Sequence, residues 1–353
     1  MGGDHAPGAE LDAAAAIVRE ARRDASVILV GDEARLREGL RERKVPESPL
    51  LRIQHASQVI AMDDAPAAPV RGKRDSSMRV CFDLVKAGEA DAVVSAGHSG
   101  AMLACGLFVL KRLPGALRPG IVATFPTLKT DVVLCDMGAN VDVQPPVLAQ
   151  FGVLGAVFSS VVHGKERPRL GLLSNGTEDG KGTDLTREAH AILKRHGANG
   201  APYDFIGYVE GRDIFTGELD AIATDGFTGN VVLKTTEGAV AAMIGLLKNA
   251  FKSSPRAQLG AALAKPALTA FKRRIDHAEI GGAPLLGIDG LALVCHGSSH
   301  GPALKNAIHA AARFADRGLT ARIAEALSRL PAEATDASSL ETRERRPASK
   351  GAS

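Results

Sequence analysis

The chain has 353 residues, of which 45% are hydrophobic, so it is long and apolar enough to bury a substantial core. Its 43 Lys and Arg residues against 40 Asp and Glu leave a formal charge of +3, too small to indicate a protein that binds nucleic acid. Aromatic residues make up only 4% and Trp is absent, whereas there are 38 glycines. This composition excludes a wholly disordered chain and favours an α/β enzyme that handles small anions.

The cysteines and the apolar runs indicate the compartment. Cys81, Cys105, Cys135 and Cys295 form no C-x-x-C pair and lack the His spacing of a zinc site, so we expect no metal centre. The N-terminus lacks the pattern of a secretory signal, and the run "AMLACGLFVL" is too short to span a bilayer. We therefore expect a cytoplasmic protein that is at most peripheral to a membrane.

The first residues, "MGGDHAPGAELDAAAAIVREA", predict a glycine loop that leads into a helix starting near Pro7. Such a loop normally follows a strand, but no strand pattern precedes it. The amides beside Gly2 and Gly3 would form an anion-binding nest, and His5 adds a group that titrates near neutrality. The alternative interpretation is a turn in which Asp4 or His5 caps the helix.

Short β-branched runs alternate with helical patterns along most of the chain. Nearly every run ends in Gly, Asp, Asn or Ser, which is typical of a parallel sheet covered by helices with its ligands at the carboxyl ends of the strands. We therefore expect most of the unusual loops at one edge of the sheet. The predicted strands are "SVILVG", "PLLRIQHA", "DAVVSAG", "GIVATFPT", "DVVLCDMG", "RLGLLSNG", "DFIGYVEG" and "DAIATDG".

Two segments depart from this alternation. Residues 237–275 are wholly helical in pattern, with Pro266 between two helices, and predict a hairpin at about 237–280 that projects from the sheet. Its apolar residues with four-residue spacing include Leu259, Leu263 and Phe271. After Leu330 the sequence has almost no large apolar residue, so we predict a single α/β domain at 1–330 and a disordered tail at 331–353.

Two polar loops in the first third of the chain are candidate sites. In "VRGKRDSSMRV", Lys73 and three arginines surround Ser76 and Ser77, which we expect to cap a helix. Cations and hydroxyls at a helix start suit a phosphate or an acidic partner. The alternative interpretation is a solvated basic turn. In "SAGHSGAM", His98 and Ser99 follow a strand where glycines admit a ligand. The G-H-S-G spacing is not that of a nucleophile elbow, so a covalent serine mechanism is disfavoured.

Two later loops combine charged or amide groups with glycines. "LLSNGTEDGKGTDL" holds Lys181 before a helix, without the spacing of a P-loop, and a mobile surface loop is the alternative. "TDGFTGN" places Asp225, Thr228 and Asn230 where a strand leads directly into a helix, and helix capping explains only part of this pattern.

The last candidate loop is "LALVCHGSSH". A strand ends at His296, and Ser298 with its neighbouring amides would form another anion cradle at a helix start. A pair of capping serines is the alternative.

Taken together and in this order, the stretches "MGGDHAP", "GKRDSSMR", "SAGHSGA", "DMGANVD", "EGRDIFTG", "TDGFTGNVVLKTTEG", "GAPLLGIDG" and "HGSS" resemble the PlsX family of phosphate acyltransferases. The resemblance implies that inorganic phosphate attacks the thioester of a long-chain acyl carrier protein and releases acyl phosphate, with no cofactor. It also implies a three-layer Rossmann-like fold, mostly parallel, of the isocitrate dehydrogenase and phosphate acetyltransferase type.

The resemblance also implies partners and a location. Members of the family are homodimers, the helical hairpin serves dimerisation and membrane association, and acyl phosphate passes to a membrane-embedded glycerol-phosphate acyltransferase. We therefore expect a cytoplasmic protein that is peripherally associated with the membrane. A basic surface from Arg71 to Arg79 is the expected contact for the carrier protein.

The sequence departs from the family pattern at two places. Family members usually carry a short strand just before Met-Gly-Gly-Asp, so we expect Met1 to be an internal methionine, or the chain to be truncated, with one strand of the sheet missing. Where the family has Asn and Thr, this chain has His98 and Ser99.

The chemistry requires two anionic groups to be held together and an oxyanion to be stabilised. As hypotheses, the phosphate is bound by Gly3, Asp4, Lys73, Lys181 and Ser298, including loop amides of "GGDHAP" and "HGSS". The thioester is oriented by Ser99, Thr228 or Asn230. His5 or His296 moves a proton while Asp225 fixes orientation.

Three other functions are weighed. A phosphate acetyltransferase that uses coenzyme A needs the same phosphate and thioester groups, whereas a dehydrogenase is disfavoured because no G-x-G-x-x-G follows a strand. A non-catalytic scaffold at the membrane surface would use the hairpin and "FKRRI", but so many polar glycine loops make it improbable.

Overall fold

The computed structural model describes residues 2–20, 25–178, 180–275, 281–331 and 334–335. Its strands are β1 (Val27–Gly31), β2 (Leu51–His55), β3 (Ala92–Ser95), β4 (Gly120–Phe125), β5 (Val132–Cys135), β6 (Arg169–Leu173), β7 (Asp204–Val209), β8 (Ala221–Ala223), β9 (Ala283–Leu286) and β10 (Leu291–Val294). All the strands predicted from β-branched runs are confirmed.

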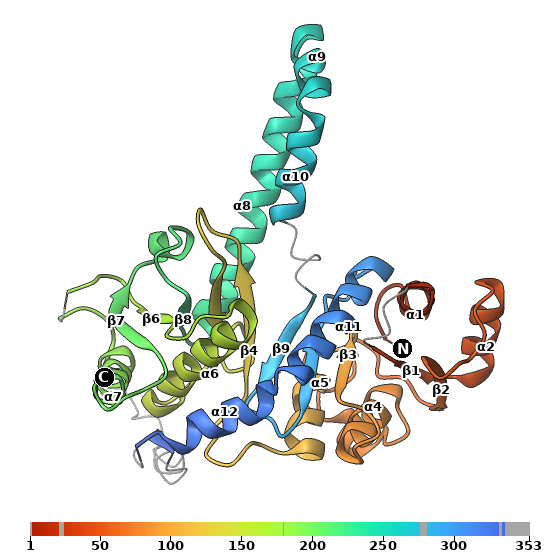
Figure 1. The fold of residues 1–353 in the computed structure, drawn as a ribbon, viewed down its shortest axis with the longest axis horizontal. Coiled ribbons are helices and arrows are strands. Elements are labelled where there is room, and N and C mark those ends of the chain that lie inside the picture. Colours follow the sequence, from red (N-terminus) through yellow and green to blue (C-terminus); the bar gives the residue numbers. More distant parts are fainter. Residues whose placement is uncertain (1, 21–24, 179, 276–280, 332–333, 336–353) are drawn as a thin grey trace, which may run out of the picture.

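The helices cover both faces of the sheet, as Figure 1 shows. They are α1 (Gly8–Arg19), α2 (Glu33–Glu42), α3 (Ala68–Arg71), α4 (Ser77–Lys86), α5 (Ser99–Cys105), α6 (Pro145–His163), α7 (Asp184–Ala198), α8 (Gly226–Lys252), α9 (Pro255–Leu263), α10 (Lys265–Ile275), α11 (Gly301–Asp316) and α12 (Leu319–Ser328). Short π- and 3₁₀-helical turns occupy Gly106–Leu110 and Gly211–Phe215.

The main sheet has eight strands in the order β3-β10-β9-β4-β5-β8-β6-β7, and β1 and β2 form a separate parallel pair. The core of one face is built by α6, whose sequence "PPVLAQFGVLGAVFSSVVH" is apolar on all sides and almost wholly buried. A second cluster packs α4 and α5 on β3, β9 and β10. The predicted fold class, a mostly parallel three-layer α/β sheet, is confirmed.

The strands of the main sheet run in two directions, which corrects the expectation that the unusual loops share one edge. β10 is parallel to β3 but antiparallel to β9, β9 is antiparallel to β4, and β4 is antiparallel to β5. β8, β6 and β7 then continue parallel to β5. The carboxyl ends of β3 and β10 therefore lie at the opposite edge from those of β5, β6, β7 and β8.

The predicted hairpin projects from the sheet as α8, α9 and α10 (Figure 1). It differs from the expectation at two points: α8 already begins at Gly226, and a first break falls at Ser253 and Ser254, where Ser254 caps α9. The expected break beside Pro266 is present at Ala264. Residues 276–280 of the predicted hairpin lie outside the described residues.

Two described helices, α6 and α8, have the length and hydropathy of a membrane span. The apolar window of α6 is 83% buried, as in the core helix of a folded domain, whereas that of α8 is 0% buried. The exposed large side chains of the hairpin include Met243, Leu246, Leu259, Leu263 and Phe271.

The folded part of the chain extends past the predicted boundary at residue 330. Ala334 is fully buried, and its carbonyl accepts a hydrogen bond of 2.7 Å from Nε2 of Gln150 on α6. The prediction that residues 331–353 are disordered is therefore wrong at Ala334. The rest of that prediction, from 336 onward, falls outside the described residues.

Candidate functional site

Three loops that are far apart in the sequence meet at the carboxyl ends of β3 and β10. The amide of Asp4 donates a hydrogen bond of 2.9 Å to the carbonyl of Gly297. Gly3 lies so close to the other two loops that an added Cβ would be 3.2 Å from the carbonyl oxygen of Ala96 and 3.4 Å from that of Gly297. We call residues 2–5, 96–99 and 296–300 the cradle. Because α1, α5 and α11 all begin beside it, their amino ends favour an anion there.

Histidine side chains surround the cradle. The rings of His5 and His300 are stacked with their centroids 4.2 Å apart, and both residues are exposed. Nδ1 of His296 lies 2.7 Å from Oγ of Ser298 and accepts a hydrogen bond from the Ser298 amide at 3.3 Å. These rings offer nitrogen atoms that can donate or accept a hydrogen bond. His300 was missed in the sequence because it stands just past the serine pair, where it is the N-cap residue of α11 without capping it by its side chain.

The other cradle candidates occupy helix starts. Ser99 is exposed and is the first residue of α5, while Nδ1 of His98 caps that helix by accepting a bond of 3.3 Å from the Ala101 amide. His98 thus has a structural role as the N-cap residue of α5. Ser76 caps α4 as expected, through the Arg79 amide.

Lys73 lies in the loop before α4, and its ammonium is already paired. Nζ is 2.6 Å from Oδ2 of Asp64 and donates to the carbonyl of Val59 at 3.1 Å. The Lys73 ammonium lowers the pKa of the Asp64 carboxyl, helped by a backbone hydrogen bond from Ala61. The next residue, Ile60, has its carbonyl 3.0 Å from the position of a Cβ on Gly2, so this loop adjoins the cradle.

A second group of polar residues lies at the carboxyl ends of β5 and β8. Asp225 caps α8: Oδ1 accepts from the Thr228 amide at 2.8 Å, and Oδ2 accepts from the Thr228 hydroxyl at 2.7 Å. Asn230 is exposed on the next turn, beside Gly138. The predicted helix start at this loop is confirmed, and both carboxylate oxygens of Asp225 are used by capping.

The carboxylate of Asp136 holds the loop on which this second group rests. The sequence patterns did not indicate this role. This carboxylate is fully buried and accepts hydrogen bonds from the amides of Ile121, Ala139 and Asn140 and from the Asn140 side chain, at 2.7 to 3.2 Å. Burial raises the pKa of Asp136, although these donors oppose the shift. The carbonyl of Asn140 in turn accepts from the amide of Gly226 at 2.9 Å, which fixes the first turn of α8.

Lys181 belongs neither to the cradle nor to the group at the carboxyl ends of β5 and β8. It is exposed in the loop after β6, where Asn175 and Glu178 organise the turn. β6 is six strands from β3 in the sheet order, or about 29 Å at the usual strand spacing, and its carboxyl end faces the other way. The hypothesis that Lys181 and the cradle bind the same phosphate is therefore not supported within a single chain.

The sequence matches a known family over most of its length. The family model described as fatty acid synthesis protein matches residues 1–322. The phosphate acyltransferase of Geobacter sulfurreducens is 49% identical over 325 residues, which is 92% of this chain and 92% of the relative. That of Anaeromyxobacter dehalogenans is 49% identical over 328 residues, covering 93% of this chain and 89% of the relative.

Solved structures support the fold alone. The EutD phosphotransacetylase from Staphylococcus aureus aligns with a TM-score of 0.58 at 15% identity, covering 86% of this chain and 90% of that protein. A phosphotransacetylase from Streptococcus pyogenes aligns with a TM-score of 0.52 at 19% identity, covering 81% and 85%. By its sequence along nearly the whole described fold, the chain belongs to the family of fatty acid synthesis proteins that includes these phosphate acyltransferases.

Proposed function

We propose that the chain is a phosphate acyltransferase that transfers a long-chain acyl group from acyl carrier protein to inorganic phosphate, for phospholipid synthesis. A phosphate oxygen attacks the thioester carbonyl, a C–O bond forms, the C–S bond breaks, and the carrier thiol leaves with a proton. The observation that carries the proposal is the cradle, where three loops and the starts of three helices converge on one small volume. Oriented amides of this kind bind an oxyanion without reorganising.

Within the cradle, the amide of Gly3 and the hydroxyl of Ser298 hold the phosphate and position its attacking oxygen, whereas the Asp4 amide already donates to the Gly297 carbonyl. The Ser298 hydroxyl lies 2.7 Å from Nδ1 of His296; with that nitrogen protonated, the ring donates to the hydroxyl, whose own hydrogen is then available to the anion. His5 or His296 holds the proton that the thiol finally takes. Ser99 orients the thioester from the start of α5.

Lys73 is a phosphate ligand only if it exchanges its bond with Asp64 for one with phosphate. Such an exchange replaces one charge-assisted hydrogen bond with another, so its net cost is small. We expect Lys73→Met to lower kcat/KM for phosphate by about 10- to 100-fold. The matched control is Arg74→Met, which removes a neighbouring exposed cation. Equal effects of the two changes would assign Lys73 to the general charge of the loop.

A phosphate acetyltransferase is the closest alternative, because it needs the same phosphate and thioester groups. The exposed apolar side chains at the start of α8 favour the long-chain substrate: Phe227 is 61% and Val231 is 48% exposed beside Thr228 and Asn230. An acetyl group is too short to bury against such a surface, whereas a long acyl chain buries apolar area there.

We further propose that the protein is a cytoplasmic homodimer with peripheral membrane contact through the hairpin. The support is the exposed apolar surface of α8, α9 and α10. We expect liposomes to retain the intact protein but not Leu259→Glu, in a flotation assay. Retention of both proteins would remove the membrane role from the hairpin.

The deciding experiment follows acyl phosphate formation by the purified protein from long-chain acyl carrier protein and inorganic phosphate, with acetyl coenzyme A as the comparison substrate. Phosphate-dependent turnover of the long-chain thioester alone is expected. Preference for acetyl coenzyme A would favour the acetyltransferase, and turnover of neither substrate by a folded protein would contradict the proposal.

A further inference from the structure

The loop that joins β2 to α4 is held together by the side chain of Lys73. At the base of this β2–α4 loop, the amide of Gln58 donates a hydrogen bond of 3.0 Å to the carbonyl of Asp75. Inside the loop, Nζ of Lys73 lies 2.6 Å from Oδ2 of Asp64 and donates to the carbonyl of Val59 at 3.1 Å. The ammonium therefore connects two parts of the loop through its charge.

The β2–α4 loop borders the cradle at two places. A Cβ on Gly2 would lie 3.0 Å from the carbonyl oxygen of Ile60. A Cβ on Gly100, the residue after the second cradle segment, would lie 3.2 Å from Cγ of Pro66. Asp64 lies between Ile60 and Pro66 in the sequence. Its ion pair with the lysine is therefore carried by the part of the loop that adjoins the cradle.

The two oxygens of the Asp64 carboxylate are used unequally. Oδ2 accepts from Lys73 and, at 2.7 Å, from the amide of Ala61, whereas Oδ1 has no hydrogen bond in the described part of the chain. The Lys73 ammonium, followed by the Ala61 amide and the charge of His98, lowers the pKa of the Asp64 carboxyl. The carboxylate is therefore ionised near neutral pH and can only accept hydrogen bonds. Its side chain is 23% exposed, so a small ion can reach it.

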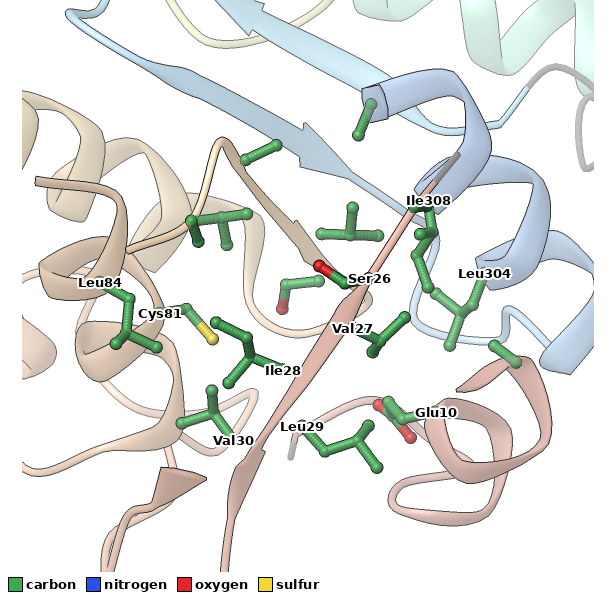
Figure 2. Close-up of a pocket in the computed structure, with 18 of the residues that line it drawn as sticks. Glu10, Ser26, Val27, Ile28, Leu29, Val30, Cys81, Leu84, Leu304 and Ile308 are labelled. Carbon is green, nitrogen blue, oxygen red and sulfur yellow. The ribbon is translucent and has the colours of Figure 1, made fainter. Parts of the chain in front are cut away.

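A cavity of about 570 Å³ between β1 and β3 is a less suitable place for phosphate (Figure 2). Apolar side chains such as Val27, Leu84 and Ile308 form much of its wall. The described residues that line it include no Lys, Arg or His, and its charged side chains are all acidic: Glu10, Glu89, Asp91 and Asp316. An anion there would face carboxylates without a cation, which is electrostatically unfavourable. The charges thus favour the Lys73 side of the cradle for phosphate.

Inorganic phosphate fits the pair of Lys73 and Asp64 in a way that sulfate does not. Near neutral pH, phosphate keeps at least one P–OH group that donates a hydrogen bond, besides oxygens that accept, whereas sulfate has acceptors alone. A phosphate ion between the two side chains would accept from the ammonium and donate to the carboxylate, so that each group exchanges one partner for another. A sulfate ion would set an oxygen against a carboxylate oxygen with no hydrogen between them.

We propose that Asp64 is a specificity-determining residue, whose carboxylate accepts a hydrogen bond from the P–OH group of inorganic phosphate and excludes anions that lack a hydroxyl. The inference rests on the proposed function, because that function places phosphate beside Lys73. Phosphate enters between the two side chains and replaces their ion pair without leaving a donor or acceptor unmatched. In its absence Asp64 occupies the ammonium, so any other anion must displace a carboxylate in order to bind.

The test measures equilibrium binding of inorganic phosphate and of sulfate by isothermal titration calorimetry, at pH 7 and constant ionic strength. It compares the parent with Asp64→Asn, which keeps an acceptor for the loop amide but replaces one carboxylate oxygen with an NH₂ donor that sulfate can use. Asp63→Asn removes an exposed carboxylate from the neighbouring position and is the matched control. Asp64→Glu keeps the carboxylate and tests for rescue.

We expect the parent to bind phosphate at least about 100-fold more tightly than sulfate. Asp64→Asn should reduce this ratio by at least about tenfold, chiefly through tighter binding of sulfate. Asp63→Asn should keep the ratio of the parent, and Asp64→Glu should lie closer to the parent than to Asp64→Asn. Circular dichroism shows whether each variant is folded.

An unchanged ratio in folded Asp64→Asn would overturn the inference and leave the proposed function intact. An equal loss of preference in Asp63→Asn would also overturn it, because the effect would then belong to the net charge of the loop. Equal affinities of the parent for the two ions would overturn it without any variant. If the folded parent bound no phosphate at all, the proposed function and the inference would both fail.

Discussion

At the scale of single residues, the carboxylate of Asp136 accepts four hydrogen bonds from described residues near the candidate site. It follows β5 directly and has no measurable exposure, yet both of its oxygens accept hydrogen bonds from the loop that supports α8. A buried acceptor with several N–H donors aimed at it is costly to remove, because each donor then loses its partner.

Asp136→Asn should therefore destabilise the fold. The new amide turns one oxygen into an NH₂ group that faces N–H donors, and we expect a loss of about 2–3 kcal/mol in the free energy of unfolding. Asp142→Asn, an exposed acidic residue nearby, is the matched control and should change it by less than about 0.5 kcal/mol. Urea denaturation of both variants makes the comparison, and equal stabilities would show that the Asp136 hydrogen bonds contribute little.

The sequence gives little indication of Asp136, and the reason is physical. Strand and loop patterns indicate where an acidic residue lies along the chain but not whether donors from a distant segment, such as Ile121, point at it. By contrast, the capping roles of Ser76 and Asp225 are local and were open to prediction, since each side chain accepts from an amide three residues on.

At the scale of elements, the first turn of α8 is fitted against the Asp136 loop through glycines. A Cβ at Gly229 would lie 1.9 Å from the Asp136 carbonyl oxygen, and one at Gly226 would lie 2.4 Å from the Asn140 carbonyl oxygen. The strand-to-helix turn that carries Thr228 and Asn230 therefore depends on residues without side chains.

Gly229→Ala should displace this turn and cost more than about 2 kcal/mol, because backbone cannot yield as a flexible side chain does. Gly238→Ala lies on the same helix with open space around it, so it should stabilise the protein by about 0.5–1 kcal/mol through helix propensity. Thermal denaturation distinguishes the two, and a neutral Gly229→Ala would show that α8 shifts freely on its support.

The packing of α1 on α11 includes a titrating contact. Glu20, just after α1, is 2.8 Å from Nζ of Lys305 and 2.8 Å from Nε2 of His309, and its hydrogen bond with Lys305, assisted by His309, lowers its pKa below the usual 4.5. A lowered pKa in the folded state means that this stabilisation is present above pH 4.5 and is lost as pH falls through the lowered value.

Glu20→Gln should consequently reduce stability at pH 7 by up to about 1 kcal/mol, and the difference from the parent should disappear as pH falls through the lowered pKa of Glu20. Glu38→Gln on the exposed side of α2 serves as the control with an unchanged pH profile. The measurement is the free energy of unfolding in urea between pH 2.5 and pH 7. A difference that persisted at the acid end would assign the effect to packing instead of charge.

At the scale of the whole molecule, strand positions could be predicted from the sequence, but strand directions could not. The β-branched runs mark β4 and β5 equally well whether they pair parallel or antiparallel, because a strand buried on both faces has no polar periodicity. Three successive antiparallel pairings, β10 with β9, β9 with β4 and β4 with β5, leave β5 opposed to β10. They separate the cradle from the group around Thr228, so loops with similar chemistry lie at opposite edges.

What covers the apolar surface of the hairpin is the remaining question about the whole molecule. Helix α8 has 27 residues and none of its apolar window is buried, which is unusual for a monomer. If a second copy covers this surface, Leu246→Glu should convert a dimer into a monomer in sedimentation velocity without lowering the melting temperature. Lys248→Glu makes a larger change of charge two residues on but removes no large apolar side chain, so it should leave the dimer intact. If both variants sediment like the parent, the apolar surface is not the dimer contact. The liposome assay with Leu259→Glu then tests separately whether lipid covers it.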